Sequence, residues 1–291
     1  MCRLAGTWVL YSPALVGLAR AQSASAPATL LSAPIQLGGE WGRSLPASAL
    51  KVVTRMRDVS LSGVKLVSDR QPDSIRVDDH SSGPPSIWLH FDRTRIAWII
   101  VDIGERDWCK LAYQFGHELG HVLCNSWGPD SKGPPPCRWL EESMVEAFSL
   151  RGLGRLATSW ELNPPFPGNN AFGVAIRRYR QNAIDKYANA VDRTSYADLA
   201  NWFRKSQGGD LEKSSGLGPI EGPAILAILA ELEKDDTCVG DLGALNRWPA
   251  RTGTPLENYL TLWTASCAEV GAPGRLPAQL RRLLLHGDGN R

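Results

Sequence analysis

The sequence has little excess of either charge, no C-x-x-C pair, no internal repeat and no apolar run long enough to span a membrane comfortably. A formal net charge of +2 gives no reason to expect nucleic acid or an anionic membrane as a partner. We expect no stable membrane insertion of the mature chain. The missing C-x-x-C spacing argues against a zinc site built from thiolates.

What is present is the composition of an ordinary globular protein. Of the 291 residues, 43% are apolar and 21% are charged. This length is sufficient for one large domain or for two lobes that share a cleft.

The N-terminus has the layout of a secretory signal peptide. Arg3 provides a short positive start, residues 4–18 are mostly apolar without a charge, and Ala19-Arg20-Ala21 fits a small-x-small cleavage site. We therefore expect residues 1–21 to be removed and the mature protein to be secreted or periplasmic. A ragged N-terminus or a wrongly chosen start codon is the alternative.

Five cysteines follow this segment. Cys124 and Cys137 bracket a loop rich in Gly and Pro, and Cys238 and Cys267 bracket a later helical region. In an exported protein this spacing predicts two disulfides, with Cys109 left over. The alternative is that all five are buried thiols.

The order of the expected elements indicates the fold class. After a flexible, Ser/Ala/Pro-rich lead-in over 22–34, we expect strands over 64–68, 87–91 and 96–103, the last buried on both faces. Helices are expected over 46–58, 108–125, 138–150, 171–191, 195–206, 222–234, 255–270 and 277–285, with Asp107 capping the second of these.

Strands followed by helices indicate an α+β protein. We place its first lobe, with the sheet, over 35–155 and an all-α lobe over 156–291.

The segment YQFGHELGHVL contains the motif H-E-x-x-H, formed by His117, Glu118 and His121. On a helix, residues four apart share a face with Cβ atoms about 5–6 Å apart. Two imidazoles so placed can bind one zinc ion at about 2.0–2.1 Å each. Glu118 lies one step round the helix, where it can act on a metal-activated water as general base. Three polar side chains on an otherwise apolar helix are costly to bury without a partner; the alternative is that they are ordinary surface or hydrogen-bonded residues.

A catalytic zinc site needs a third protein ligand. The next helix, RWLEESMVEAF, provides Glu141, Glu142 and Glu146. Glu142 and Glu146 are four apart, so one can bind the metal while the other accepts a proton from the far nitrogen of a ligand histidine. Glu141 is expected to point into solvent. The remaining histidines are isolated in the sequence and are expected to be ordinary surface or core residues: His80, His90 and His286.

These motifs resemble the gluzincin metallopeptidases, which include thermolysin and the zinc aminopeptidases. Trp139-Leu140-Glu141-Glu142 is similar to the Trp-Leu-Asn-Glu pattern of the aminopeptidases, which implies that Glu142 is the third ligand. Glu146 falls where thermolysin-like enzymes place an acid that orients a ligand histidine. The resemblance covers about residues 87–152. It implies a zincin-like lobe, in which a twisted sheet lies over the active-site helix, with a helical lobe across the cleft.

The sequence departs from this family in two respects. His121 and Glu142 are 21 positions apart, slightly more than is usual. No Gly-x-Met-Glu-Asn segment precedes the motif, so aminopeptidase specificity does not carry over. Similar short motifs occur in intracellular regulatory peptidases, but the apparent signal peptide argues against that branch.

We therefore expect a zinc-dependent hydrolase that binds Zn²⁺ and cleaves a peptide or protein substrate. The family resemblance implies a Tyr or His that stabilises the oxyanion, and the C-terminal half of the chain, where the family places this residue, has four candidate tyrosines: Tyr179, Tyr187, Tyr196 and Tyr259.

Two alternatives to a peptidase are open. One alternative is a non-catalytic zincin-like protein that keeps the metal for structure. Another is a metal-dependent amidase of cell-wall peptides, in which exposed Trp side chains stack on sugars.

Overall fold

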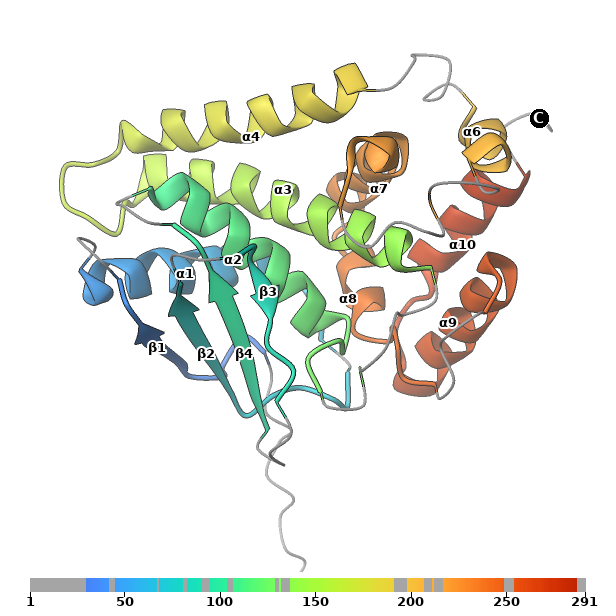
Figure 1. Ribbon diagram of the computed structural model, residues 1–291, viewed down its shortest axis with the longest axis horizontal. Helices are drawn as coiled ribbons and strands as arrows, with labels where there is room; N and C mark the ends of the chain where they lie inside the picture. The colour runs from blue at the N-terminus through green and yellow to red at the C-terminus, as the bar shows by residue number, and fades with distance from the viewer. Residues whose placement is uncertain are drawn as a thin grey trace, which may run out of the picture.

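The computed structural model describes residues 30–41, 45–66, 68–80, 83–90, 95–103, 107–128, 131, 137–190, 198–206, 211, 217–248 and 254–286. A small sheet lies beside a larger set of helices (Figure 1). The predicted α+β class is confirmed. The predicted signal peptide lies outside the described residues, as does most of the lead-in. Leu30 and Ala33, at the end of that lead-in, are buried in the core.

The sheet has the strand order β1-β2-β4-β3. Its strands are β1 (Ile35–Gly39), β2 (Ser74–Asp79), β3 (Ser86–Ile87) and β4 (Ile96–Val101). β1, β2 and β4 are parallel, whereas β3 pairs antiparallel with β4 at the edge. Ile75 and Val77 of β2 lie beside Ala97 and Ile99 of β4, and all four side chains are fully buried. This apolar face therefore anchors the sheet to the helices.

The strand predictions were correct only in part. β4 was predicted, but Trp98 on its outer face is only half-buried, so β4 is not buried on both faces. The predicted strand over 87–91 is reduced to β3, and β1 and β2 were not predicted. The prediction of a strand over 64–68 is wrong. That segment passes α8 (Cys238–Leu242), where the Lys65 carbonyl lies beside Gly240, and its described residues have no strand to pair with.

The predicted helices are present in the described part of the chain. They are α1 (Pro46–Leu61), α2 (Trp108–Leu123), α3 (Arg138–Leu162), α4 (Phe172–Ala190), α6 (Leu199–Ser206), α7 (Gly222–Lys234), α9 (Leu256–Val270) and α10 (Arg275–Arg281). A π-helical turn (Arg282–His286) continues α10, and a 3-10 turn (Pro219–Glu221) precedes α7. As predicted, Asp107 caps α2, since its carboxylate accepts a hydrogen bond from the Lys110 amide at 2.9 Å. α8 was not predicted.

α3 is longer than expected and lies at the centre of the helical packing. It packs against α1, α2, α4 and α7 (Figure 1). Residues 139–153 of this helix are buried without interruption. The predicted division between lobes, at residue 155, falls inside this helix, so α3 belongs to both predicted parts.

Two glycines allow α2 to approach α3 and α1 closely. A Cβ added at Gly120 would lie 2.8 Å from the Val145 Cβ and 3.1 Å from the Val145 Cα. A Cβ at Gly116 would lie 2.8 Å from the Ser149 Oγ and 2.4 Å from the terminal methyl of Met56. Larger residues at these positions would force the helices apart.

The structure does not contain the two predicted disulfides. In the described part of the chain no bond joins Cys124 to Cys137 or Cys238 to Cys267, and all four side chains are buried, as is Cys109. Two of the thiols have other partners, since Cys137 donates to the Thr254 carbonyl and Cys267 to Asp241. Burial also raises the pKa of Cys238 and of Cys267 to about 12, which disfavours the thiolates that disulfide formation requires.

The described helices include none that is both long and apolar enough to span a bilayer.

Gly120→Ala is expected to lower the free energy of unfolding by about 1–3 kcal/mol, because overpacking at Val145 outweighs the gain in helix propensity. Denaturant unfolding measures the change. Gly154→Ala is the matched control on α3, where the added Cβ meets only the flexible end of Arg180. If Gly120→Ala is as stable as wild type, α2 and α3 do not depend on this close contact.

Candidate metal centre

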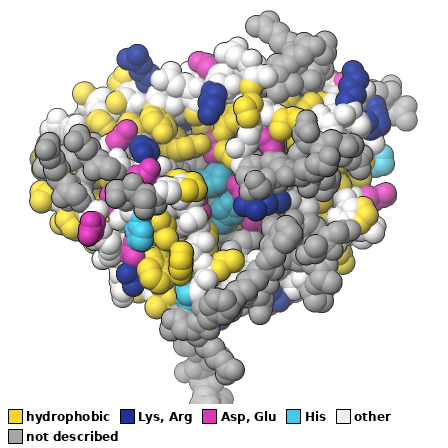
Figure 2. Space-filling view, in the orientation of Figure 1, with side chains coloured by type: hydrophobic (Ala, Val, Ile, Leu, Met, Phe, Trp, Pro, Cys, Tyr) yellow, Lys and Arg dark blue, Asp and Glu magenta, His cyan; other side chains and the backbone are white. Residues whose placement is uncertain are grey.

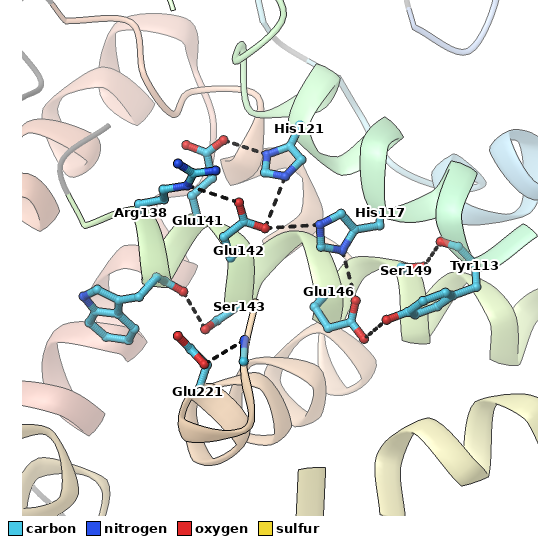
Figure 3. A network of polar contacts seen from close by, with 12 residues as sticks. Tyr113, His117, His121, Arg138, Glu141, Glu142, Ser143, Glu146, Ser149 and Glu221 are labelled. Carbon is cyan, nitrogen blue, oxygen red and sulfur yellow. Dashed lines mark hydrogen bonds and ion pairs between the residues drawn. The ribbon is translucent and has the colours of Figure 1, made fainter. Parts of the chain in front are cut away.

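The close packing of α2 on α3 brings three side chains to one point (Figure 3). The Nε2 of His117 lies 3.2 Å from the Oε2 of Glu142, and the Nε2 of His121 lies 3.5 Å from the same oxygen. One ligand atom from each of the three residues lies within 4.8 Å of the others, and the described residues contain no second group of this kind. His117 and His121, one helical turn apart on α2, therefore face Glu142 on α3.

The far nitrogen of His117 has its own partner on α3. Its Nδ1 donates to the Oε2 of Glu146 at 3.0 Å. The other oxygen of Glu146 accepts hydrogen bonds from Tyr113 at 2.7 Å and from Tyr187 at 3.0 Å. Glu146 is fully buried, so these donors compensate its loss of hydration. This contact keeps a proton on the Nδ1 of His117, so Nε2 is the nitrogen that a metal can bind.

His121 is held in the same way by a residue whose role was not predicted. Glu141 was expected to be solvated, but it is only 2% exposed, and its Oε1 accepts from the Nδ1 of His121 at 2.9 Å. The prediction was wrong because spacing along α3 alone does not show that a second element covers this side of the helix. That cover includes Asn246, whose amide donates to the other oxygen of Glu141 at 2.8 Å.

Asn246 is itself fixed by its surroundings. It has a left-handed backbone conformation, with φ of 57°, and its amide nitrogen also lies 3.1 Å from the Cys124 carbonyl. The Tyr259 hydroxyl donates to its side-chain oxygen at 3.1 Å. The orientation of His121 therefore depends on the packing of the C-terminal helices.

The imidazoles and carboxylates of the centre shift one another's pKa values toward the ionised forms. Burial opposes protonation of His117, but its contacts with Glu142 and Glu146 outweigh burial and raise its pKa to about 9. Burial would raise the pKa of Glu142, but the two imidazoles hold it well below its usual range. The carboxylate is therefore ionised and ready to bind a cation.

Glu118 lies beside this group, but it is not one of the three residues whose ligand atoms converge. It is 4% exposed and lines the same cleft. Burial raises the pKa of its carboxyl, and the neighbouring His117 and His121 offset part of that increase. A buried carboxylate with a raised pKa suits a group that must both accept and release a proton.

The centre opens into a cleft of about 610 Å³. Figure 2 shows histidine side chains at the floor of a hollow, with cationic side chains next to them. One wall is formed by β3 and its flanks, including Pro85, Ile87 and Leu89. A small molecule or an extended chain therefore has access to the ligand atoms.

The donor set fits zinc better than a hard cation. Two imidazole nitrogens and one carboxylate oxygen are a ligand set found in catalytic zinc sites, whereas Mg²⁺ and Ca²⁺ prefer oxygen ligands alone. In both histidines the Nδ1 already donates to a glutamate, so Nε2, which faces Glu142, is the nitrogen that a metal would bind in place of a proton.

The other predicted residues lie outside this group. His80 is half exposed near Asp78, His90 contacts the Ile96 carbonyl, and His286 is exposed.

The tyrosines considered for the oxyanion have other roles in the structure. Tyr187 and Tyr259 are buried, and their hydroxyls donate hydrogen bonds to Glu146 and Asn246. Tyr179 packs on Tyr113, and Tyr196 lies outside the described residues. Of the described tyrosines, the cleft lining includes Tyr113, which sequence reasoning did not single out.

Comparison with known proteins provides no family: no family model, curated protein or solved structure matches this chain.

Glu142→Ala is expected to weaken zinc binding by at least about 100-fold, since it removes one of the three side chains that could hold the ion. Competition with a chromophoric chelator measures the affinity. Glu161→Ala is the matched control, because Glu161 is a partly exposed acid on the same helix. Unchanged zinc affinity in Glu142→Ala would show that the third ligand is elsewhere.

Glu141→Gln is expected to weaken zinc binding by about 10–100-fold, the usual effect of removing an acid that orients a ligand histidine. The effect should depend on Asn246, so a double-mutant cycle of Glu141→Gln with Asn246→Ala should be non-additive. Zinc affinity and thermal unfolding are both measured, to separate loss of orientation from loss of stability. Additive effects would mean that Asn246 does not act through Glu141.

Proposed function

We propose that this protein is a zinc-dependent hydrolase that cleaves peptide bonds. The observation that carries the proposal is the convergence of His117, His121 and Glu142 at the floor of an open cleft, with the buried Glu118 beside them. A site that only held a metal for structure would be closed by a fourth protein ligand. It would also need no buried carboxylate beside the metal.

Each side chain has a separate task. His117, His121 and Glu142 hold the ion, and Glu146 and Glu141 keep the two imidazoles in the required tautomer. Zinc, when bound, supplies a Lewis acid that lowers the pKa of water and polarises a carbonyl. Glu118 takes the proton of the attacking water and passes it to the leaving nitrogen of the scissile peptide bond.

The edge strand supports a peptide as the substrate. In the described sheet β3 is an edge strand that pairs only with β4, and its residues Ser86 and Ile87 line the cleft. An extended chain can add to such an edge through its backbone hydrogen bonds. This mode of binding would bring successive peptide groups past the metal ligands.

A zincin-like arrangement is part of the proposal. The sheet, the helix with the two histidines and the helix with Glu142 occur in the order that gluzincins have, and helices that follow in the chain, α4 and α7, pack against α3 (Figure 1). We further propose secretion or export to the periplasm, on the composition of residues 1–21.

Glu118→Gln should retain zinc and lose about 10²–10⁴-fold in hydrolysis of unfolded casein, because Gln cannot accept the proton. Bound zinc is quantified in the same sample, and a chelator should abolish wild-type cleavage. Glu161→Gln, the same change on the surface of α3, should cleave as wild type does. Full activity of zinc-loaded Glu118→Gln would rule out Glu118 as the base.

The same assay separates the other candidate functions. Wild-type protein that binds zinc but cleaves neither casein nor muropeptides would be a metal-binding protein. Cleavage of muropeptides alone would make it an amidase of cell-wall peptides.

A further inference from the structure

Arg138 is a cationic side chain beside the metal ligands that has no task in the hydrolysis described above. It is the first residue of α3 and lines the cleft. Its Nε lies 3.6 Å from the Oε1 of Glu142, the oxygen that does not face the histidines (Figure 3). No other Lys or Arg belongs to the described lining of the cleft.

The contact with Glu142 leaves most of the guanidinium available. The Arg138 side chain is 41% exposed, and the distance to Glu142 exceeds that of a hydrogen bond. An ion pair four residues apart on a helix, exposed to this extent, is weak. A guanidinium has five N–H donors, and none of them has a hydrogen-bond partner among the described residues that the structure records.

The position of Arg138 is not explained by the stability of α3. The N-terminal end of a helix carries a partial positive charge, which disfavours a cation in the first turn. Cys137, the preceding residue, provides no side-chain cap. A cation that the helix itself does not favour, at the mouth of a cleft, is typical of a functional residue.

The charges around the cleft indicate what Arg138 can bind. The neighbouring acids are already engaged: Glu141 and Glu142 contact the histidines, and Glu118 is buried. Arg binds carboxylates through paired, charge-assisted hydrogen bonds. Consecutive residues of a peptide are only 3.8 Å apart at their Cα atoms, so a guanidinium next to a ligand of the metal can reach a residue that adjoins the scissile bond.

We propose that Arg138 determines specificity by binding a carboxylate of the substrate close to the bond that is cleaved. The carboxylate comes either from an acidic side chain or from the C-terminus of the peptide. The proposal rests on the proposed hydrolase function for its substrate, but recognition of the carboxylate can be measured without hydrolysis.

The first experiment measures binding alone. Zinc-loaded protein is titrated with succinyl monohydroxamic acid and with butyrohydroxamic acid, which have the same chain length but differ in the carboxylate. Wild type should bind the succinyl probe more tightly by at least about tenfold, and Arg138→Met should lose this difference. Arg177→Met, an exposed arginine of α4 outside the cleft, is the matched control and should keep it.

The binding experiment also separates recognition from support of Glu142. If Arg138→Met lowers zinc affinity but retains the preference for the succinyl probe, Arg138 only supports the ligand and the proposal is wrong. Equal binding of both probes by wild type would also overturn it.

The second experiment uses hydrolysis to identify the source of the carboxylate. Cleavage sites in casein are mapped by mass spectrometry for wild type and Arg138→Glu, and the charge reversal should replace acidic by basic residues next to the cut. Peptides that wild type cleaves are then compared with versions in which the acidic side chain or the C-terminus is an amide. The change that raises KM for wild type but not for Arg138→Met identifies the source.

The two proposals fail in different ways. If no peptide is cleaved but the succinyl probe is preferred, the hydrolase function fails and carboxylate binding by Arg138 stands. If casein is cleaved at the same sites by wild type and by Arg138→Glu, the hydrolase function stands and the specificity proposal fails.

Discussion

The closeness of α2 to α3 is the constraint on which the rest of the molecule depends. Gly120 lies against Val145 with no room for a Cβ, and this contact sets how near the imidazoles of α2 come to the carboxylates of α3. At this separation one ligand atom from each of His117, His121 and Glu142 lies within 4.8 Å of the others. The sheet, α1, α4 and α7 pack around this pair of helices and hold it in place.

Much of the site could be predicted from the sequence because it depends on local spacing. Residues four apart on a helix share a face whatever surrounds them, so spacing alone predicts the pairs His117/His121 and Glu142/Glu146. The same periodicity located most of the helices. Periodicity could not predict that Glu141 is buried and holds His121, because Asn246, the partner of Glu141, is 105 positions away in the chain. β2 alternates buried and half-buried residues over only a few positions, and its pairing with β1 is not encoded locally.

The chemistry of the centre follows from how completely its groups are supported. Each ligand histidine has a glutamate on its far nitrogen, and each of those glutamates has further donors from Tyr113 and Tyr187 or from Asn246. For Glu118, by contrast, the described residues provide no such set of partners, and burial raises the pKa of its carboxyl. The site thus combines a well-supported group that could hold a metal with one buried acid, Glu118, beside it. Arg138, exposed at the rim, adds a charge that neither the ligands nor the helix requires.

The link between Glu141 and Asn246 has a consequence for the order in which the protein matures. Ribosomes make the chain from its N-terminus, so both ligand helices emerge well before Asn246 and the α9 helix that carries Tyr259. A nascent chain that ends before this region has His117, His121 and Glu142, but lacks the Asn246 amide that holds Glu141 against His121. The complete centre can form only when the chain has been synthesised beyond Tyr259 and has folded. A partly made chain is thus without the finished site.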